Sequence, residues 1–167
     1  MKHFSLMITT CVLLIAACTY DAPITEEHTI AIDPAVLGMW EAIPEDDEDP
    51  GDMERVLVLK FSDTEYLVQH IDGDLVLFFR GYAIEIEGVP AVQLQLIGNN
   101  DSPADETEQE LFSIVSYGLL DGELVVNVLN TDLVSSELKD SKAIREAFVA
   151  NKDNEELFGD PTTYRKL

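Results

Sequence analysis

The sequence predicts a mainly β protein: an antiparallel meander of about eight strands closes into a barrel, and one helix precedes the C-terminal strand. Three observations predict this fold. Short apolar runs of strand length follow one another from residue 37 onward, with turn residues between them. Asp-Gly pairs at 72–73 and 121–122 are strong hairpin signals. Near the C-terminus, the apolar spacing changes from the strand period to the helical period.

Five strands are expected in the first part of the domain, at Leu37–Ile43, Arg55–Phe61, Glu65–Ile71, Leu75–Glu87 and 91–98. The last of these alternates most clearly, because Val92, Leu94 and Leu96 share one face and glutamines share the other. Gly81 lies inside the long fourth run, where a glycine often marks a bulge.

The second part of the domain is expected to hold three strands and the helix. The strands are Leu111–Leu120, Glu123–Leu129 and Thr162–Leu167, after a polar loop at 99–110. The helix is expected at Ser141–Ala150, with Ile144 and Phe148 on its apolar face and Asp140 or Ser141 as its N-cap. A further helical turn is expected within Thr131–Leu138.

Closure into a barrel removes the two open edges that a meander would otherwise leave for pairing with other chains. Eight strands suffice for a small barrel filled by its own side chains. The alternative is a strongly bent open sheet with the helix across its mouth.

The N-terminal segment has the features of a signal peptide, which we expect to cover residues 1–17. Lys2 gives a positive start, and an apolar stretch runs from Phe4 to Ala17. A helix of that length would span roughly 21 Å, whereas a bilayer core is about 30 Å thick. The alternative is an N-terminal anchor helix.

Leu14-Ile15-Ala16-Ala17-Cys18 resembles the bacterial lipobox, an aliphatic residue followed by two small residues and cysteine. The resemblance implies that Cys18 carries acyl chains such as palmitate and becomes the N-terminus after cleavage. Thr19 is not the aspartate that retains such lipoproteins at the inner membrane, which implies an outer-membrane anchor facing the periplasm. Residues 18–33 are then expected to form a flexible, lipidated tether, and residues 34–167 the barrel domain.

The composition excludes several classes of protein. The chain has only Cys11 and Cys18, so a domain beginning after Cys18 has no disulfide, no catalytic thiolate and no cysteine-ligated metal. The formal net charge of −23 disfavours binding to nucleic acid. No cofactor motif is present.

The densest acidic run, at 45–52, raises the question of a cation site. Its candidate ligands are Asp46, Asp47, Asp49 and Asp52. Calcium takes six to eight oxygen ligands, but this run lacks the alternating spacing of an EF-hand loop. Consecutive like charges are more typical of a solvated loop, so the residues are weak candidates.

The order of the elements, and Gly38-Met39-Trp40 in the first strand, resemble the calycins, and in particular the Gly-x-Trp signature of lipocalins. The resemblance implies that Trp40 closes one end of the barrel and that a basic side chain of the last strand, here Arg165, packs across it. The ending of the chain also resembles small bacterial lipoproteins of unassigned function.

Few residues suggest catalysis. His70 is the only histidine expected in the folded domain, and a lone strand histidine is usually structural. Glu85 and Glu87 are expected on one strand face, at a spacing that could flank a sugar, although solvation alone explains such a pair.

Arg80 shares strand parity with Val76 and Phe78, so it is a candidate for binding an acidic ligand if that face points into the barrel.

These observations favour a membrane-anchored, non-enzymatic envelope lipoprotein with a structural or protein-interaction role. One alternative is a lipocalin-like carrier of a small apolar or amphipathic ligand. A second alternative is a hydrolase that uses carboxylates. The expected partners are the membrane, through the lipid, and an envelope protein or a small apolar ligand.

Overall fold

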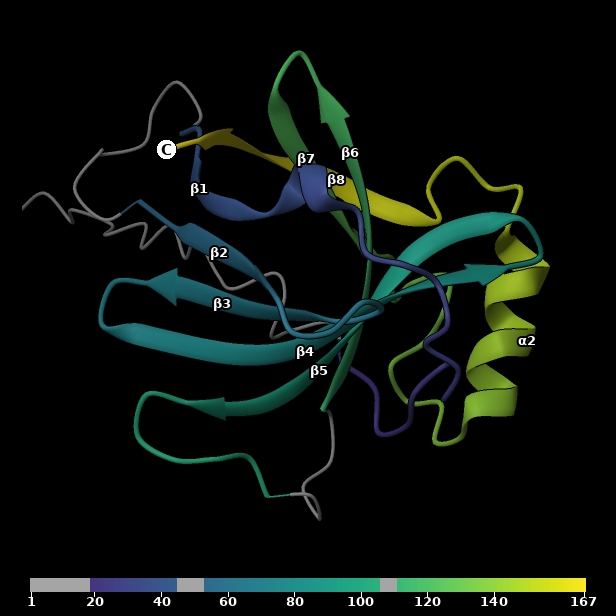
Figure 1. The fold of residues 1–167 in the computed structure, drawn as a ribbon. Helices are drawn as coiled ribbons and strands as arrows, with labels where there is room; N and C mark the ends of the chain where they lie inside the picture. Colours follow the sequence, from purple (N-terminus) through teal and green to yellow (C-terminus); the bar gives the residue numbers. More distant parts are fainter. Residues whose placement is uncertain (1–18, 45–52, 106–110) are drawn as a thin grey trace, which may run out of the picture.

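The computed structural model describes residues 19–44, 53–105 and 111–167. Eight antiparallel strands form a closed barrel in sequence order, and a helix lies beside the far end of the β4–β5 hairpin (Figure 1). The predicted fold class is therefore confirmed. The elements are the 3-10 helix η1 (Pro34–Val36), β1 (Gly38–Ala42), β2 (Arg55–Lys60), β3 (Tyr66–Asp72), β4 (Leu75–Ile86), β5 (Val89–Asn99), β6 (Phe112–Leu120), β7 (Glu123–Leu129), α2 (Ser141–Asn151) and β8 (Phe158–Lys166).

The tight turns follow the residues that can adopt positive φ. Asp121 and Gly122 have φ of 54° and 87° and join β6 to β7, as the sequence predicts. Glu87 and Gly88, with φ of 50° and 85°, form a similar two-residue turn between β4 and β5. Each of these turns fixes the register of its hairpin.

The bulge expected at Gly81 lies elsewhere. The register of β4 against β5 shifts between Phe78 and Phe79 instead. The glycine has a packing role, because a Cβ at Gly81 would lie 2.9 Å from Cδ2 of Leu94. The missing side chain therefore leaves room for the side chain of Leu94, on the neighbouring strand β5, to pack in the barrel interior.

The helix matches its prediction closely. The side chain of Asp140 accepts a hydrogen bond from the backbone N–H of Ala143 and caps the helix. Ile144 and Phe148 are buried on its inner face. The helical turn expected within 131–138 is present as an isolated turn, in which the N–H groups of Leu133 and Val134 donate to the carbonyl of Asn130. The last strand begins at Phe158, earlier than expected.

Strand β4 buries apolar side chains on both of its faces. Leu77 and Phe79 point into the barrel, where they join a cluster with β5 and β6. Farther along the strand, Tyr82, Ile84 and Ile86 are buried on the opposite face, beneath α2 and the N-terminal segment. This double burial explains why the sequence of β4 is a nearly continuous apolar run.

Residues 19–33, here named the strap, are not the flexible tether that their polar composition predicts. Tyr20 is fully buried, and its backbone pairs with that of Phe112 in β6. Ile24 is also buried, in the cluster with α2. Farther along, the N–H of Ile32 donates to the carbonyl of Asp63 in the β2–β3 turn. The strap is therefore part of the folded domain.

Candidate functional site

One end of the barrel is sealed around Trp40. The ring is 1% exposed, and its Nε1 donates a hydrogen bond of 2.8 Å to the carbonyl of Val36 in η1. The basic residue over the ring is Lys166, whose Nζ lies 5.1 Å from the ring centroid, so the expectation for Arg165 is wrong. Adjacent residues of a strand point to opposite faces, so only one of these two side chains can face the indole.

Arg165 lies on the outer face of the barrel, with Glu41 of β1. The carboxylate of Glu41 accepts hydrogen bonds from Arg165 and from Arg55 of β2. The Arg165 and Arg55 guanidinium groups hold the pKa of Glu41 below its ordinary value. A buried carboxylate thus links three neighbouring strands, β8, β1 and β2.

Arg80 also points outward, which contradicts its candidacy as a ligand-binding residue inside the barrel. It does share a face with Val76 and Phe78, but that face is the outer one, because Leu77 and Phe79 fill the interior. Its guanidinium pairs with the buried carboxylate of Glu65. The hydrogen bond from Arg80 lowers the pKa of Glu65.

His70 is the one histidine that points into the barrel from a described strand. It is 2% exposed, and its Nε2 lies 2.9 Å from Oε1 of Glu54. The hydroxyl of Tyr164 donates to the same carboxylate. Nδ1 of His70 has no hydrogen-bond partner among the described residues. This cluster is a structural cross-link between β3, β8 and the start of β2.

Burial and hydrogen bonding act in opposite directions on the Glu54 cluster. Burial alone would raise the pKa of Glu54, but the hydrogen bonds from His70 and Tyr164 outweigh it and the pKa is lowered. Burial raises the pKa of Tyr164, and the neighbouring Glu54 raises it further. The tyrosine therefore remains a donor and the glutamate an acceptor around neutral pH.

The paired carboxylates expected on one strand face are not arranged as a pair. Glu85 is exposed on β4, whereas Glu87 has left the strand and occupies the turn with positive φ. The apolar neighbours Ile84 and Ile86 are buried on the other face, as predicted.

The barrel interior is almost filled by its own side chains. Its cavity has a volume of only about 80 Å³. The wall of the cavity is apolar and consists mainly of valine side chains, with leucine side chains and the rings of tyrosines. Small-molecule sites usually have volumes of about 300–1,000 Å³. The interior is therefore too small to enclose a typical ligand.

A larger groove of about 310 Å³ lies at the mouth of the barrel, between the strap and the β4–β5 hairpin. Ile30 and Ala31 of the strap form one wall, and Ala83, Glu85 and Pro90 of the hairpin form the other.

Tyr117 lines both the groove and the interior cavity, so it marks the boundary between them. Burial raises the pKa of Tyr117, and the neighbouring Tyr66 and Asp33 raise it further. Its hydroxyl therefore keeps its proton.

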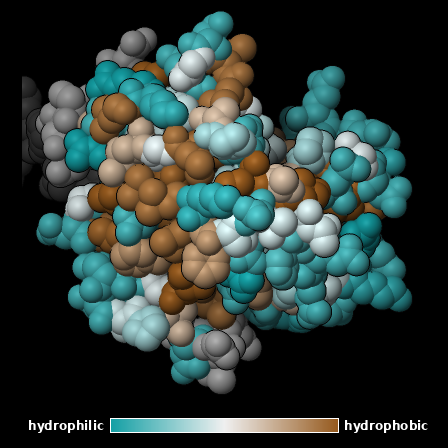
Figure 2. Space-filling view, viewed as in Figure 1, coloured by the Kyte–Doolittle hydropathy of each residue, from teal (hydrophilic) through white to brown (hydrophobic). Residues whose placement is uncertain are grey.

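The outer surface of β1–β4 carries a second feature, here named the apolar face. Its apolar residues alternate with the inward-facing core residues; they are Met39, Leu57, Leu59, Leu67, Ile71, Val76 and Phe78. Three pairs lie directly opposite each other, Met39 with Leu57, Leu59 with Leu67 and Ile71 with Val76, whereas Leu57 and Phe78 both lie opposite Gln69. Figure 2 shows apolar side chains over the part of this view where Figure 1 places β2 to β5. Leu59 is 41% exposed, and Phe61, just beyond β2, is 62% exposed. Soluble sheets usually present polar residues on such a surface.

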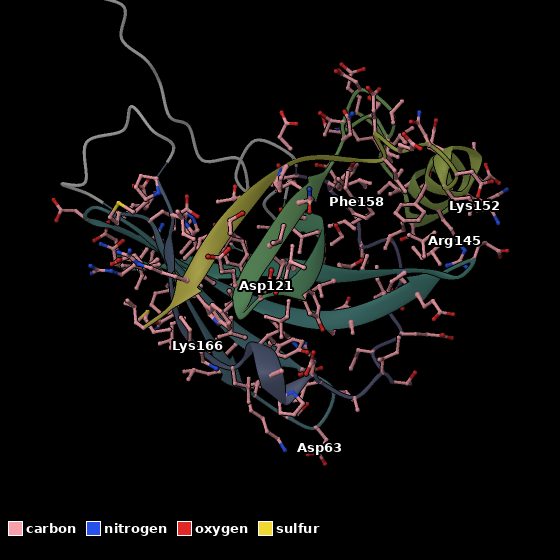
Figure 3. The ribbon with its side chains drawn as sticks, turned by 90° about the horizontal axis from the view of Figure 1, so that it is seen from above. Asp63, Asp121, Arg145, Lys152, Phe158 and Lys166 are labelled. Carbon is pink, nitrogen blue, oxygen red and sulfur yellow. The ribbon has the colours of Figure 1, made fainter. Side chains whose placement is uncertain are left out.

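Paired charges border the apolar face. Three of the four arginines in the sequence lie along it: Arg55 and Arg165 with Glu41, and Arg80 with Glu65. The remaining arginine, Arg145, lies on α2 at the far side of the molecule from Lys166 (Figure 3). An apolar centre with arginine at its margin is the composition typical of protein interfaces.

The sequence analysis missed the strap and the apolar face. The strap has no strand or helix periodicity, so nothing marked Tyr20 and Ile24 as core residues. The apolar face did leave a signal. The run "VLVL" at 56–59 does not alternate, which indicates a strand with apolar side chains on both faces.

Two features of the sequence analysis lie outside the described residues. These are the lipobox with Cys18, and the weak cation candidates Asp46, Asp47, Asp49 and Asp52. In the ranges that the structure describes, no group of three or more potential metal-ligating side chains is present. Within the same ranges, no helix has the length and apolar character needed to cross a membrane.

Comparison with models of known protein families, with curated proteins and with solved structures found no match.

Proposed function

We propose that this chain is a non-enzymatic envelope lipoprotein, anchored through acyl chains on Cys18, which acts by binding another protein through the apolar face. The observation that carries this proposal is the apolar outer surface of β1–β4. An outer sheet surface with this many apolar side chains is characteristic of an interaction site. The lipobox pattern supports the anchor, and Thr19 in place of the retaining aspartate favours the outer membrane, facing the periplasm.

The small interior cavity argues against a carrier that encloses its ligand in the barrel. The separation of Glu85 from Glu87 argues against a hydrolase that would use this pair. The proposal therefore rests on the outer surface of the barrel.

The anchor is tested by expressing the full chain in a bacterial host with labelled palmitate. We expect the label in the wild type and in the Cys11→Ser variant, and its loss in Cys18→Ser, together with release from the membrane fraction. Cys11→Ser is the matched control, because Cys11 lies inside the proposed signal peptide. Unlabelled wild-type protein would rule out the lipid anchor.

The protein-binding surface is tested with a photo-crosslinking residue placed at Leu59 or, as a control, at Arg145 on the far side of the molecule. We expect a discrete cross-linked species from position 59 in the native envelope and none from position 145. Leu67→Asp on the same face should abolish that species without changing the thermal unfolding midpoint by more than a few degrees. Equal cross-linking from both positions would contradict a specific surface.

A further inference from the structure

The groove at the barrel mouth is a site separate from the apolar face. It lies between the strap and the inner side of the β4–β5 hairpin, whereas the apolar face covers the outside of β1–β4. Its volume of about 310 Å³ reaches the range of small-molecule sites, which begins at about 300 Å³. The groove is open to solvent, so a ligand can enter it without passing through the filled barrel interior.

The charge of the groove selects among possible ligands. Glu85 is the only charged residue in its lining, and no hydrogen bond or ion pair links that carboxylate to another residue in the described ranges. No basic side chain lines the groove, so an anion would find no partner there. The formal net charge of −23 adds a long-range attraction for cations.

The rest of the lining is apolar, apart from the tyrosine at the inner end. Ile30, Ala83 and Pro90 offer methyl and ring surface to an alkyl group, and the hydroxyl of Tyr117 is already hydrogen-bonded to Tyr66 and Asp33. An apolar wall with one carboxylate matches a molecule that has an apolar body and a single positive charge.

We propose that this groove binds a small amphipathic cation, with its ammonium group at Glu85 and its apolar part against Ile30, Ala83 and Pro90. The site also depends on the strap, because Ile30 and Ala31 supply one of its walls. A ligand that binds only while the strap is docked stabilises the docked state by mass action.

The test is an NMR titration of the full chain with hexylammonium, with 1-hexanol and hexanoate as probes of equal chain length and different charge. We expect saturable shifts of the methyl groups of Ile30, Ala31 and Ala83 with hexylammonium, weaker shifts with 1-hexanol and none with hexanoate. Hydrogen exchange of the strap amides should slow in the presence of hexylammonium.

Two variants separate a specific site from a general attraction of cations. Glu85→Gln should weaken hexylammonium binding about threefold to tenfold. Glu87→Gln removes the same charge two residues away, outside the groove, and should change affinity by less than about twofold. Equal effects of the two variants, or shifts with hexanoate at the same methyl groups, would overturn the proposal.

Discussion

Gly38 shows how one residue shapes the sealed end of the barrel. Its φ of 130° lies in a region that side chains disfavour, and a Cβ there would lie 3.0 Å from Cε of Lys166. The glycine therefore lets the lysine stem cross Trp40. The Gly-x-Trp spacing thus has a local physical reason in this chain.

We predict that Gly38→Ala costs about 1–3 kcal/mol of the free energy of unfolding, because the new methyl group meets both the strained φ and the lysine stem. Urea denaturation followed by tryptophan fluorescence measures this cost. Gly118→Ala is the matched control, since its Cβ would have no neighbour within 4 Å, and it should change stability by less than about 0.5 kcal/mol. A similar cost at both positions would show that the strained φ and the lysine stem at Gly38 are not its cause.

The Glu54 cluster predicts a dependence of stability on pH. The folded-state pKa of Glu54 lies below its ordinary value of 4.5. Its contribution is therefore complete above pH 4.5 and is lost as the pH falls through the lowered folded-state pKa. We predict that Glu54→Gln lowers the free energy of unfolding by about 1–2 kcal/mol at pH 7 and reduces the loss below pH 4.5.

Denaturation curves collected from pH 7 to pH 3 measure this effect. The slope below pH 4.5 should persist in part, because the pKa values of Glu41 and Glu65 are also lowered by their arginine partners. The exposed Glu137→Gln serves as the control and should leave the curve unchanged. An unaltered acid slope in Glu54→Gln would contradict the assignment.

At the scale of elements, the side chain of Gln93 attaches the middle of the strap, in addition to the backbone bonds of Tyr20 with Phe112 and of Ile32 with Asp63. This side chain is fully buried, and its Oε1 accepts a hydrogen bond of 2.6 Å from the backbone N–H of Ile24. Its Nε2 donates to the hydroxyl of Tyr82 and to the carbonyl of Thr25. One amide thus binds the strap backbone on both sides of a peptide unit and fixes the strap on β5.

We predict that Gln93→Leu costs about 2–3 kcal/mol, because it leaves buried backbone groups of the strap without partners. Hydrogen exchange at the amides of Ile24 and Thr25 should accelerate by at least tenfold. Gln95→Leu, two residues farther along the same face, is the control and should leave that exchange unchanged. If the strap amides keep their protection in Gln93→Leu, the backbone bonds of Tyr20 and Ile32 and the apolar contacts hold the strap without Gln93.

Elements with local signals could be predicted from the sequence, and those held by long-range contacts could not. The Asp-Gly turns and the helix with Asp140 follow from neighbouring residues, and the structure confirms them. The strap depends on Gln93, more than sixty residues away, and no local pattern encodes that pairing. The outward direction of Arg80 depends on which face of β4 the barrel encloses, which parity alone does not decide.

The candidate sites follow the same division. The sequence motif identified Trp40, but the basic residue over its ring is Lys166 and not the predicted Arg165. The register between β1 and β8, which places Lys166 opposite Trp40, decides which side chain crosses the ring. The groove combines strap and hairpin residues about fifty positions apart, so no sequence window contains it. Contacts of this range emerge only when the sheet has closed.

For the whole molecule, the dominant electrostatic feature is the net charge of −23 that the full sequence carries. Folding brings these charges closer together, so self-repulsion opposes the compact state. Attractive ion pairs such as Glu41 with Arg55 and Glu65 with Arg80 are few by comparison. Screening should therefore remove more repulsion than attraction.

We predict that the free energy of unfolding rises by an amount on the order of 1 kcal/mol when NaCl increases from about 0.01 M to 0.5 M, where the screening length falls from about 30 Å to a few ångströms. Thermal and urea denaturation at fixed pH measure this rise. Potassium chloride should give the same result, because screening depends on ionic strength and not on the cation. A larger rise with CaCl₂ at equal ionic strength would point to cation binding by the acidic run at 45–52, and a fall with NaCl would show that the ion pairs dominate.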